Sequence, residues 1–208
     1  MERLTVSPSD PDPQVLAVAA AALSRGGIAI FPTDTLYGLA ADPRSPAAID
    51  RVFRLKGRAA EQALPLIAAS LEQVERVLGG VSGRTRQLAE RFWPGPLTLV
   101  VEAGPDVAVA VLGARGTVAV RVPGHAVARG LSAAVGFPVV STSANRAGRA
   151  APATADEAIA ALGGEVDVAL DAGPVPGGAP STIVDARGDH VTLIRAGAIP
   201  FAIVLEAL

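Results

Sequence analysis

The sequence predicts a domain of the α/β or α+β class, in which a twisted mixed β-sheet is flanked by helices. Two patterns favour this class. Apolar segments of helical and of strand character alternate along the chain, and several strand-like segments follow one another near its end. Half of the 208 residues are hydrophobic, so one sizeable core can form. We therefore expect a single domain over residues 1–208.

Start and stop signals mark the expected helices. An alanine-rich segment, residues 14–25, follows Pro13 and stops at a Gly-Gly pair. Ser45 and Pro46 supply an N-cap and a first-turn proline for a second helix, which delivers Lys56 and Arg58 at its end. Further helices are expected over 71–78, 83–92, 125–136, 154–163 and 201–208, with capping boxes at Ser70/Gln73 and Thr154/Glu157.

Apolar runs with β-branched residues are the expected strands. The run 138–143 (PVVSTS) is interpreted as one strand with a polar tip, and the Gly/Pro-rich stretch 171–182 as a flexible loop over a site. The full set of expected strands is 28–31, 64–69, 97–102, 117–122, 138–143, 166–173, 181–187 and 191–197.

Composition excludes several kinds of chemistry. The chain has no cysteine and two histidines, which removes disulfides, thiolate nucleophiles and most His-rich or Cys-based metal sites. A net charge of −2 and only seven aromatic residues (one Trp, one Tyr, five Phe) argue against a general nucleic-acid surface. Because the start is not a signal peptide and no long apolar run occurs, we expect a cytoplasmic protein without membrane contact.

The strongest internal clue is a count of basic residues. Of the 18 cationic side chains, 17 are arginine and Lys56 is the single lysine. A compact ammonium suits one phosphate oxygen, whereas arginine presents a planar fork, so a phosphate site would explain the exception. The alternative is a lysine kept by chance on a solvated helix end. Lys56-Gly57-Arg58 and the cluster 141–145 (STSAN) together favour a phosphate cradle, although such hydroxyl-rich tips are also common as plain turns.

Familiar nucleotide and hydrolase motifs are absent. The sequence has no GxxxxGK[ST] loop, no GxGxxG after a strand and no GxSxG elbow. His125 follows a strand and is interpreted as a loop or helix-start histidine rather than a catalyst.

Six ordered blocks of the sequence resemble the YrdC/TsaC family of threonylcarbamoyl-AMP synthases. They are IAIFPTDTLYGLAAD (28–42), VFRLKGR (52–58), RFWPGPLTLV (91–100), TVAVRVPGH (117–125), VVSTSANRAG (139–148) and STIVDARG…LIRAGAI (181–199). The resemblance implies a YrdC-like fold with a concave, positively charged cavity. It also implies synthesis of threonylcarbamoyl-AMP and pyrophosphate from L-threonine, bicarbonate and ATP, with Mg²⁺ accompanying ATP. A partner transferase complex would then modify tRNA at an adenosine beside the anticodon.

The resemblance also implies roles for individual residues. Lys56 and Arg58 would be the catalytic cations. The implied ATP contacts are Lys56, Arg58, Gln62, Thr117, Ser143, Asn145 and Arg195, and the implied L-threonine contacts are Thr35, Arg121, Ser141 and Ser181. No metal ligand is implied.

The chain departs from the family pattern in several places. Ala59 stands where many members have proline, the segment EQALPLIAA lacks an expected histidine, and Ala151 replaces a frequent serine. We expect a short form without the extra C-terminal domain of longer relatives. Two alternatives stay open. The chain could be an RNA-binding or ribosome-associated protein that uses the cavity for a double-stranded RNA backbone, or a relative with another carbamoyl or acyl substrate.

Overall fold

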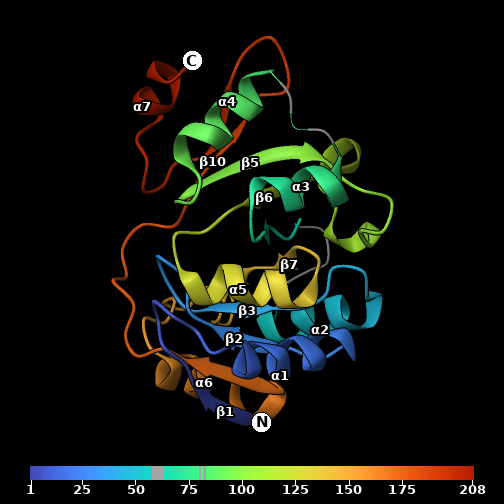
Figure 1. Cartoon of the computed structure of the whole chain (residues 1–208), viewed down its shortest axis with the longest axis vertical. Coiled ribbons are helices and arrows are strands. Elements are labelled where there is room, and N and C mark those ends of the chain that lie inside the picture. The colour runs from blue at the N-terminus through green and yellow to red at the C-terminus, as the bar shows by residue number, and fades with distance from the viewer. Residues whose placement is uncertain (58–62, 80, 82) are drawn as a thin grey trace.

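The computed structural model describes residues 1–57, 63–79, 81 and 83–208. Over these ranges the strands form two mixed sheets, stacked along the long axis of the molecule with helices around them (Figure 1). The expected α/β class is confirmed. The expectation of one sheet is replaced by two, and the division between them creates the site described below.

The first sheet contains the N-terminal strands and lies in the lower half of Figure 1. Its strand order is β1-β9-β2-β3-β8. Strands β1, β9 and β2 run parallel, whereas β3 is antiparallel to both β2 and β8. The bounds are β1 Glu2–Thr5, β2 Ala29–Phe31, β3 Gly38–Ala40, β8 Thr142–Ser143 and β9 Val168–Asp171.

The second sheet lies in the upper half and has the order β11-β10-β5-β6-β4-β7. Pairs β10/β5 and β4/β6 are parallel, and the other neighbours are antiparallel. The bounds are β4 Leu66–Ile67, β5 Leu97–Glu102, β6 Thr117–Arg121, β7 Val139–Val140, β10 Thr182–Asp185 and β11 Thr192–Arg195.

The helices begin and end close to the expected signals. Ser45 Oγ accepts from the Ala48 N–H at 3.3 Å, and Gly57 closes the same helix in the left-handed conformation (φ 60°). The α-helices are α1 Pro13–Ser24, α2 Pro46–Lys56, α3 Leu71–Leu78, α4 Gly83–Phe92, α5 Ala126–Val135, α6 Ala155–Leu162 and α7 Phe201–Glu206; the 3₁₀ turns are η1 Val109–Val111, η2 Ala114–Gly116 and η3 Gly163–Glu165.

The two capping boxes form with the same pair of contacts, and one of them has a further partner. Thr154 Oγ1 accepts from the Glu157 N–H, and the Glu157 carboxylate reaches back to the Ala153 N–H. At the start of α3, Ser70 caps the Gln73 N–H and the Gln73 amide oxygen accepts from the Ala69 N–H; the same amide also bonds to Ser132 on α5. The Ser70/Gln73 box therefore joins α3 to α5 besides capping the start of α3.

The expected strand 138–143 is wrong as a single element. Its first part, β7, pairs with β4 of the second sheet, and its last part, β8, pairs with β3 of the first. The chain changes sheet at Ser141, whose N–H donates to the Pro65 carbonyl at 2.8 Å. The apolar run looks continuous because both halves are buried, although their pairing partners differ.

Strands β1 and β3 were not expected from the sequence. Each is short, and three of the four β1 residues are exposed, so neither carries a strand pattern of its own. Pairing with neighbours holds them in place. Gly38 fits here because a Cβ at that position would lie 2.9 Å from the Phe31 ring on the adjacent strand.

The largest apolar cluster joins both sheets. It contains Ile30 of β2, Leu66 of β4 and Val120 of β6, each fully shielded from solvent. Because one core supports both halves, the polar loops at their junction sit on a rigid base. Within the described ranges, no helix is long and apolar enough to cross a membrane.

Candidate active site

A cavity of about 1300 Å³ is lined by residues from both sheets. That volume exceeds the roughly 300–1,000 Å³ of a typical small-molecule site, so two substrates fit together. The charged side chains that line its described walls are five cations and one carboxylate, namely Lys56, Arg115, Arg121, Arg187, Arg195 and Asp185. The expected positively charged, concave cavity is therefore confirmed.

Lys56 is buried at the C-terminal end of α2, with 4% of its surface exposed. Its Nζ donates to the Ser143 carbonyl at 2.6 Å, to Ser143 Oγ at 3.1 Å and to Asn145 Oδ1 at 2.8 Å. The alternative of a solvated helix-end lysine is wrong. The lysine and the hydroxyl-rich cluster, separated by 87 to 89 residues in sequence, form one unit on the cavity wall.

The geometry around Nζ explains why arginine is not used at this position. An ammonium group has three donors on one atom, and at least three oxygens of the described residues converge on it here. A planar guanidinium would spread its donors over three nitrogens and needs more room. Ser143 Oγ also donates to Asn145 Oδ1 at 2.6 Å, which fixes the two acceptors relative to each other.

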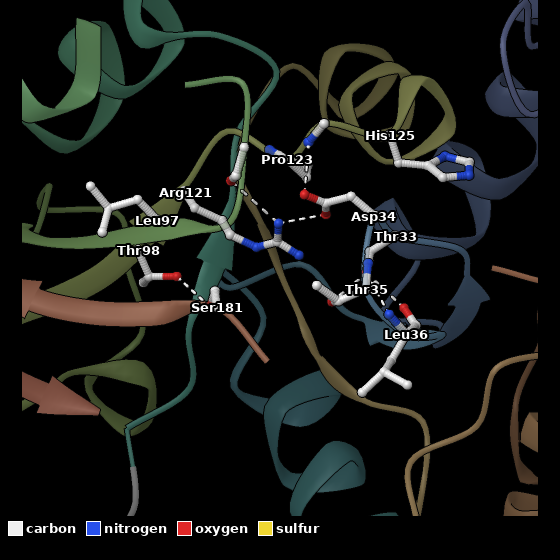
Figure 2. Close-up of polar contacts among 12 residues, drawn as sticks. Thr33, Asp34, Thr35, Leu36, Leu97, Thr98, Arg121, Pro123, His125 and Ser181 are labelled. Carbon is white, nitrogen blue, oxygen red and sulfur yellow. Dashed lines mark hydrogen bonds and ion pairs between the residues drawn. The ribbon is translucent and has the colours of Figure 1, made fainter. Parts of the chain in front are cut away.

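Arg121 ends β6 and is paired with Asp34, a residue that the sequence analysis missed (Figure 2). Arg121 Nη1 donates to Asp34 Oδ1 at 2.6 Å, and the other carboxylate oxygen accepts from the Gly124 N–H at 3.1 Å. Arg121 is 6% exposed. The only sequence signal for this pairing was the place of Asp34 beside Thr35 in the PTDT segment.

Thr35 is held by a local turn in the loop between β2 and β3. Thr33 Oγ1 accepts from the Thr35 and Leu36 N–H groups and lies 3.1 Å from Thr35 Oγ1. Thr33 is buried, so this turn is fixed and presents Thr35 on the cavity wall.

Ser181 and Arg195 form a third polar group in the cavity. Arg195 Nη2 donates to the Ser181 carbonyl at 2.8 Å and to Ser181 Oγ at 3.0 Å, and Thr98 Oγ1 lies 2.8 Å from the same hydroxyl. Desolvation first, and Arg121 second, lower the pKa of Arg195. Because Ser181, an expected threonine contact, is hydrogen-bonded to Arg195, an expected ATP contact, the two sets of expected contacts meet at this point.

The remaining expected residues are distributed as follows. Thr117 Oγ1 donates to the Ala114 carbonyl at 2.9 Å, and Thr117, Ser141 and Ala151 all line the cavity. Arg58, Ala59 and Gln62 lie outside the described residues. Pro180 and Ser181, at the end of the expected 171–182 loop, also reach the cavity wall.

Arg115 is a further cavity residue that the sequence analysis missed. It lies in η2 and has φ 60°, and it is the one non-glycine residue with positive φ in the described part of the chain. A strained conformation beside a cavity indicates a functional constraint. The sequence offered a weak signal, because an arginine between Ala114 and Gly116 looks like an ordinary turn residue.

His125 is not among the residues that line the cavity. Its Nδ1 accepts from the Val127 N–H at 3.3 Å, so it caps α5, and its interpretation as a helix-start histidine is confirmed. Burial lowers the pKa of His125, Arg129 lowers it further, and Asp34 opposes both.

The fold and site define a class of α/β protein in which two mixed sheets enclose a cationic cavity. A family model described as "Telomere recombination" (Sua5, YciO and YrdC) matches residues 21–197. This chain belongs to that family.

Two relatives are named for the same activity. The chain is 35% identical to a threonylcarbamoyl-AMP synthase of Bacillus subtilis (strain 168), over 92% of this chain and 55% of the relative. It is 40% identical to one of Thiobacillus denitrificans, over 78% of this chain and 86% of the relative. The chain thus spans about half the length of the Bacillus relative but most of the Thiobacillus one.

Solved structures have the same fold. Sua5 of P. abyssi, crystallised with L-threonine, matches with a TM-score of 0.92 and 32% identity, over 100% of this chain and 61% of that one. YciO of E. coli matches with a TM-score of 0.86 over 96% of this chain and 98% of that one, but at 24% identity it supports the fold alone.

Proposed function

We propose that this chain synthesises threonylcarbamoyl-AMP and pyrophosphate from L-threonine, bicarbonate and ATP. The observation that carries the proposal is the contact of Lys56 Nζ with Ser143 and Asn145 on the wall of a cationic cavity. Relatives named for this activity, and a Sua5 structure that contains L-threonine, support the choice of substrates.

We assign two groups of contacts to the two larger substrates. Cations and hydroxyls suit ATP phosphates, and the proposed ATP contacts are Lys56, Arg58, Gln62, Thr117, Ser143, Asn145 and Arg195. A guanidinium fork with nearby hydroxyls suits an amino acid, and the proposed L-threonine contacts are Thr35, Arg121, Ser141 and Ser181.

The proposed chemistry needs no protein nucleophile. The amino group of threonine adds to the carbon of bicarbonate to give a carbamate, with loss of water. A carbamate oxygen then forms a bond to the α-phosphorus of ATP, the bond from that phosphorus to the β-phosphate oxygen breaks, and pyrophosphate leaves. Lys56 and Arg58 stabilise the charge that develops on the phosphates, and the substrates are held in line by the two contact groups.

Mg²⁺ would enter with ATP rather than occupy a protein cage. Within the described residues there is no cluster of three or more His, Cys, Asp or Glu side chains, and Asp185 is the one carboxylate on the described cavity wall. Such a site fits a metal held by phosphates and waters. When bound, Mg²⁺ would neutralise part of the phosphate charge.

Mass spectrometry of the reaction product tests the proposal. Purified chain incubated with L-threonine, bicarbonate, ATP and Mg²⁺ should yield a threonylcarbamoyl adduct of AMP, and reactions without bicarbonate should not. Parallel reactions with serine and glycine test for another carbamoyl substrate. Equal adduct formation with all three amino acids would favour that alternative, and no adduct with any of them would refute synthase activity.

We propose that the product is passed to a tRNA threonylcarbamoyl transferase complex in the cytoplasm. A mixed anhydride of a carbamate and a phosphate is reactive, so a consuming partner suits this chemistry. Titration with double-stranded RNA tests the binding alternative: tight, salt-sensitive RNA binding without ATP affinity would favour it.

A further inference from the structure

Asp34 connects the two sheets beside the cavity: it is not itself a lining residue, but its partner Arg121 is. It lies in the loop between β2 and β3 of the first sheet, whereas Arg121 and Gly124 follow from β6 of the second. Each of its carboxylate oxygens has a separate partner, Arg121 Nη1 at 2.6 Å and the Gly124 N–H at 3.1 Å. The Asp34 side chain is 18% exposed and that of Arg121 is 8% exposed, so the pair is largely desolvated.

One nitrogen of the Arg121 guanidinium is used by the protein. Nη1 donates to Asp34 and weakly, at 3.5 Å, to the Gly95 carbonyl. Among described residues, no hydrogen bond is made by Nε or Nη2. Figure 2 shows Nη2 turned toward the side where Thr35 lies, and Thr35, Ser181 and Arg121 line the same cavity. The Nε and Nη2 edge is therefore available for a second carboxylate.

The charge of Asp34 also affects which anions can bind. Arg195 lies close enough to Arg121 for the two positive charges to repel each other. Two adjacent cations would attract any small anion, including the phosphates of ATP or inorganic phosphate. The Asp34 carboxylate, bound to Arg121, neutralises one of these two positive charges. What remains is a directional pair of donors, which suits the carboxylate of a zwitterionic amino acid.

We infer that Asp34 is a positioning residue: it holds Arg121 by Nη1, turns the Nε and Nη2 edge into the cavity, and makes this subsite selective for an amino-acid carboxylate over phosphate. The inference rests on the proposed function for the identity of the amino acid. It adds a residue and a selectivity to that function.

Calorimetry with the full chain tests the positioning role. Two probes are used, L-threonine and L-threonine amide, which lacks the negative carboxylate. Asp34→Ala should weaken threonine binding by about tenfold or more and reduce the preference for threonine over the amide, while ATP binding changes less than about twofold. Unchanged threonine affinity would overturn the inference. Equal losses for threonine and ATP would also overturn it, because they indicate a purely structural role.

A second variant tests the charge and guards against misfolding. Asp34→Asn keeps one oxygen that can accept from Arg121 but removes the negative charge. It should lose less threonine affinity than Asp34→Ala and should bind inorganic phosphate several-fold more tightly than the unmodified chain. Phosphate affinity at or below that of the unmodified chain would contradict the selectivity.

Asp167→Ala is a matched control. Asp167 also pairs with an arginine, Arg51, and accepts from a backbone N–H, that of Ile28, but Arg51, unlike Arg121, is not among the residues that line the cavity. This variant should leave threonine and phosphate affinities unchanged. If the unmodified chain binds no threonine, the proposed function fails at this subsite. The role of Asp34 is still decided by the phosphate comparison.

Discussion

Lys56 Nζ lies 2.8 Å from Asn145 Oδ1, although 89 residues separate them in sequence. This contact joins the end of α2 to the loop after β8, and it fixes one wall of the cavity. Because the amide oxygen is neutral, this contact orients the lysine without itself forming an ion pair. The ammonium group is therefore held in a fixed position on the cavity wall.

Lys56→Arg should lower ATP-dependent product formation by about 10²-fold. The charge is kept, but a planar fork cannot place three donors on the three oxygens that converge at this point. Pyrophosphate release with threonine and bicarbonate present measures the effect. Arg54→Ala is the control, since Arg54 is exposed on the same helix. If the Lys56→Arg variant is about as active as the control, Lys56 does not have the proposed role at the ATP phosphates.

Asn145→Asp should raise the KM for ATP by about tenfold while the KM for threonine stays nearly constant. A carboxylate at this position would form an ion pair with Lys56 and neutralise the cation that is proposed to meet phosphate. Steady-state kinetics in both substrates provides the measurement. A parallel rise of both KM values would instead indicate that the cavity as a whole is distorted.

Tyr37→Phe should lower the free energy of unfolding by about 1–3 kcal/mol. The buried Tyr37 hydroxyl donates to the Gly173 carbonyl at 2.7 Å and accepts from the Ala172 N–H at 3.1 Å, so its loss leaves two backbone groups without that partner. Urea denaturation measures the change. An unfolding midpoint equal to that of the unmodified chain would show that water replaces the hydroxyl without cost.

Two substitutions of Arg115 test whether its positive φ serves activity at a cost in stability. Arg115→Gly should raise the free energy of unfolding by up to about 1 kcal/mol, because glycine adopts φ 60° without strain. Arg115→Ala keeps the strain and should not stabilise the fold. Both variants should lose activity if the guanidinium contacts substrate in the cavity. Full activity in the more stable glycine variant would refute a functional reason for the strain.

His125 should make stability depend on pH below about 6.5. Burial, with Arg129, lowers its pKa in the folded state, so the unfolded state binds a proton first as pH falls. Stability is thus present above the unfolded pKa and is lost as pH falls from about 6.5 toward the lower folded value. His125→Asn keeps a capping side chain and removes the titration. Thermal unfolding between pH 7 and 5.5 should decline less steeply in this variant, and an identical slope would contradict the assignment.

The sequence by itself determined much of the local structure. Pro13, Ser45, Ser70 and Thr154 mark the helix starts within a residue or two, because capping and proline preferences act over a single turn. It also singled out Lys56 by composition and identified the family by ordered motifs. The placements of Arg58 and Gln62 stay predictions.

The tertiary structure decided where the chain changes sheet and which distant residues meet. The change at Ser141 depends on the pairing of β7 and β8 with strands from different sheets, and a local apolar pattern does not encode that choice. The partnership of Asp34 with Arg121 spans 87 residues and likewise arises only when the two sheets pack on one core. Local propensities act over a few residues, whereas a cavity between two sheets is created by contacts far apart in sequence.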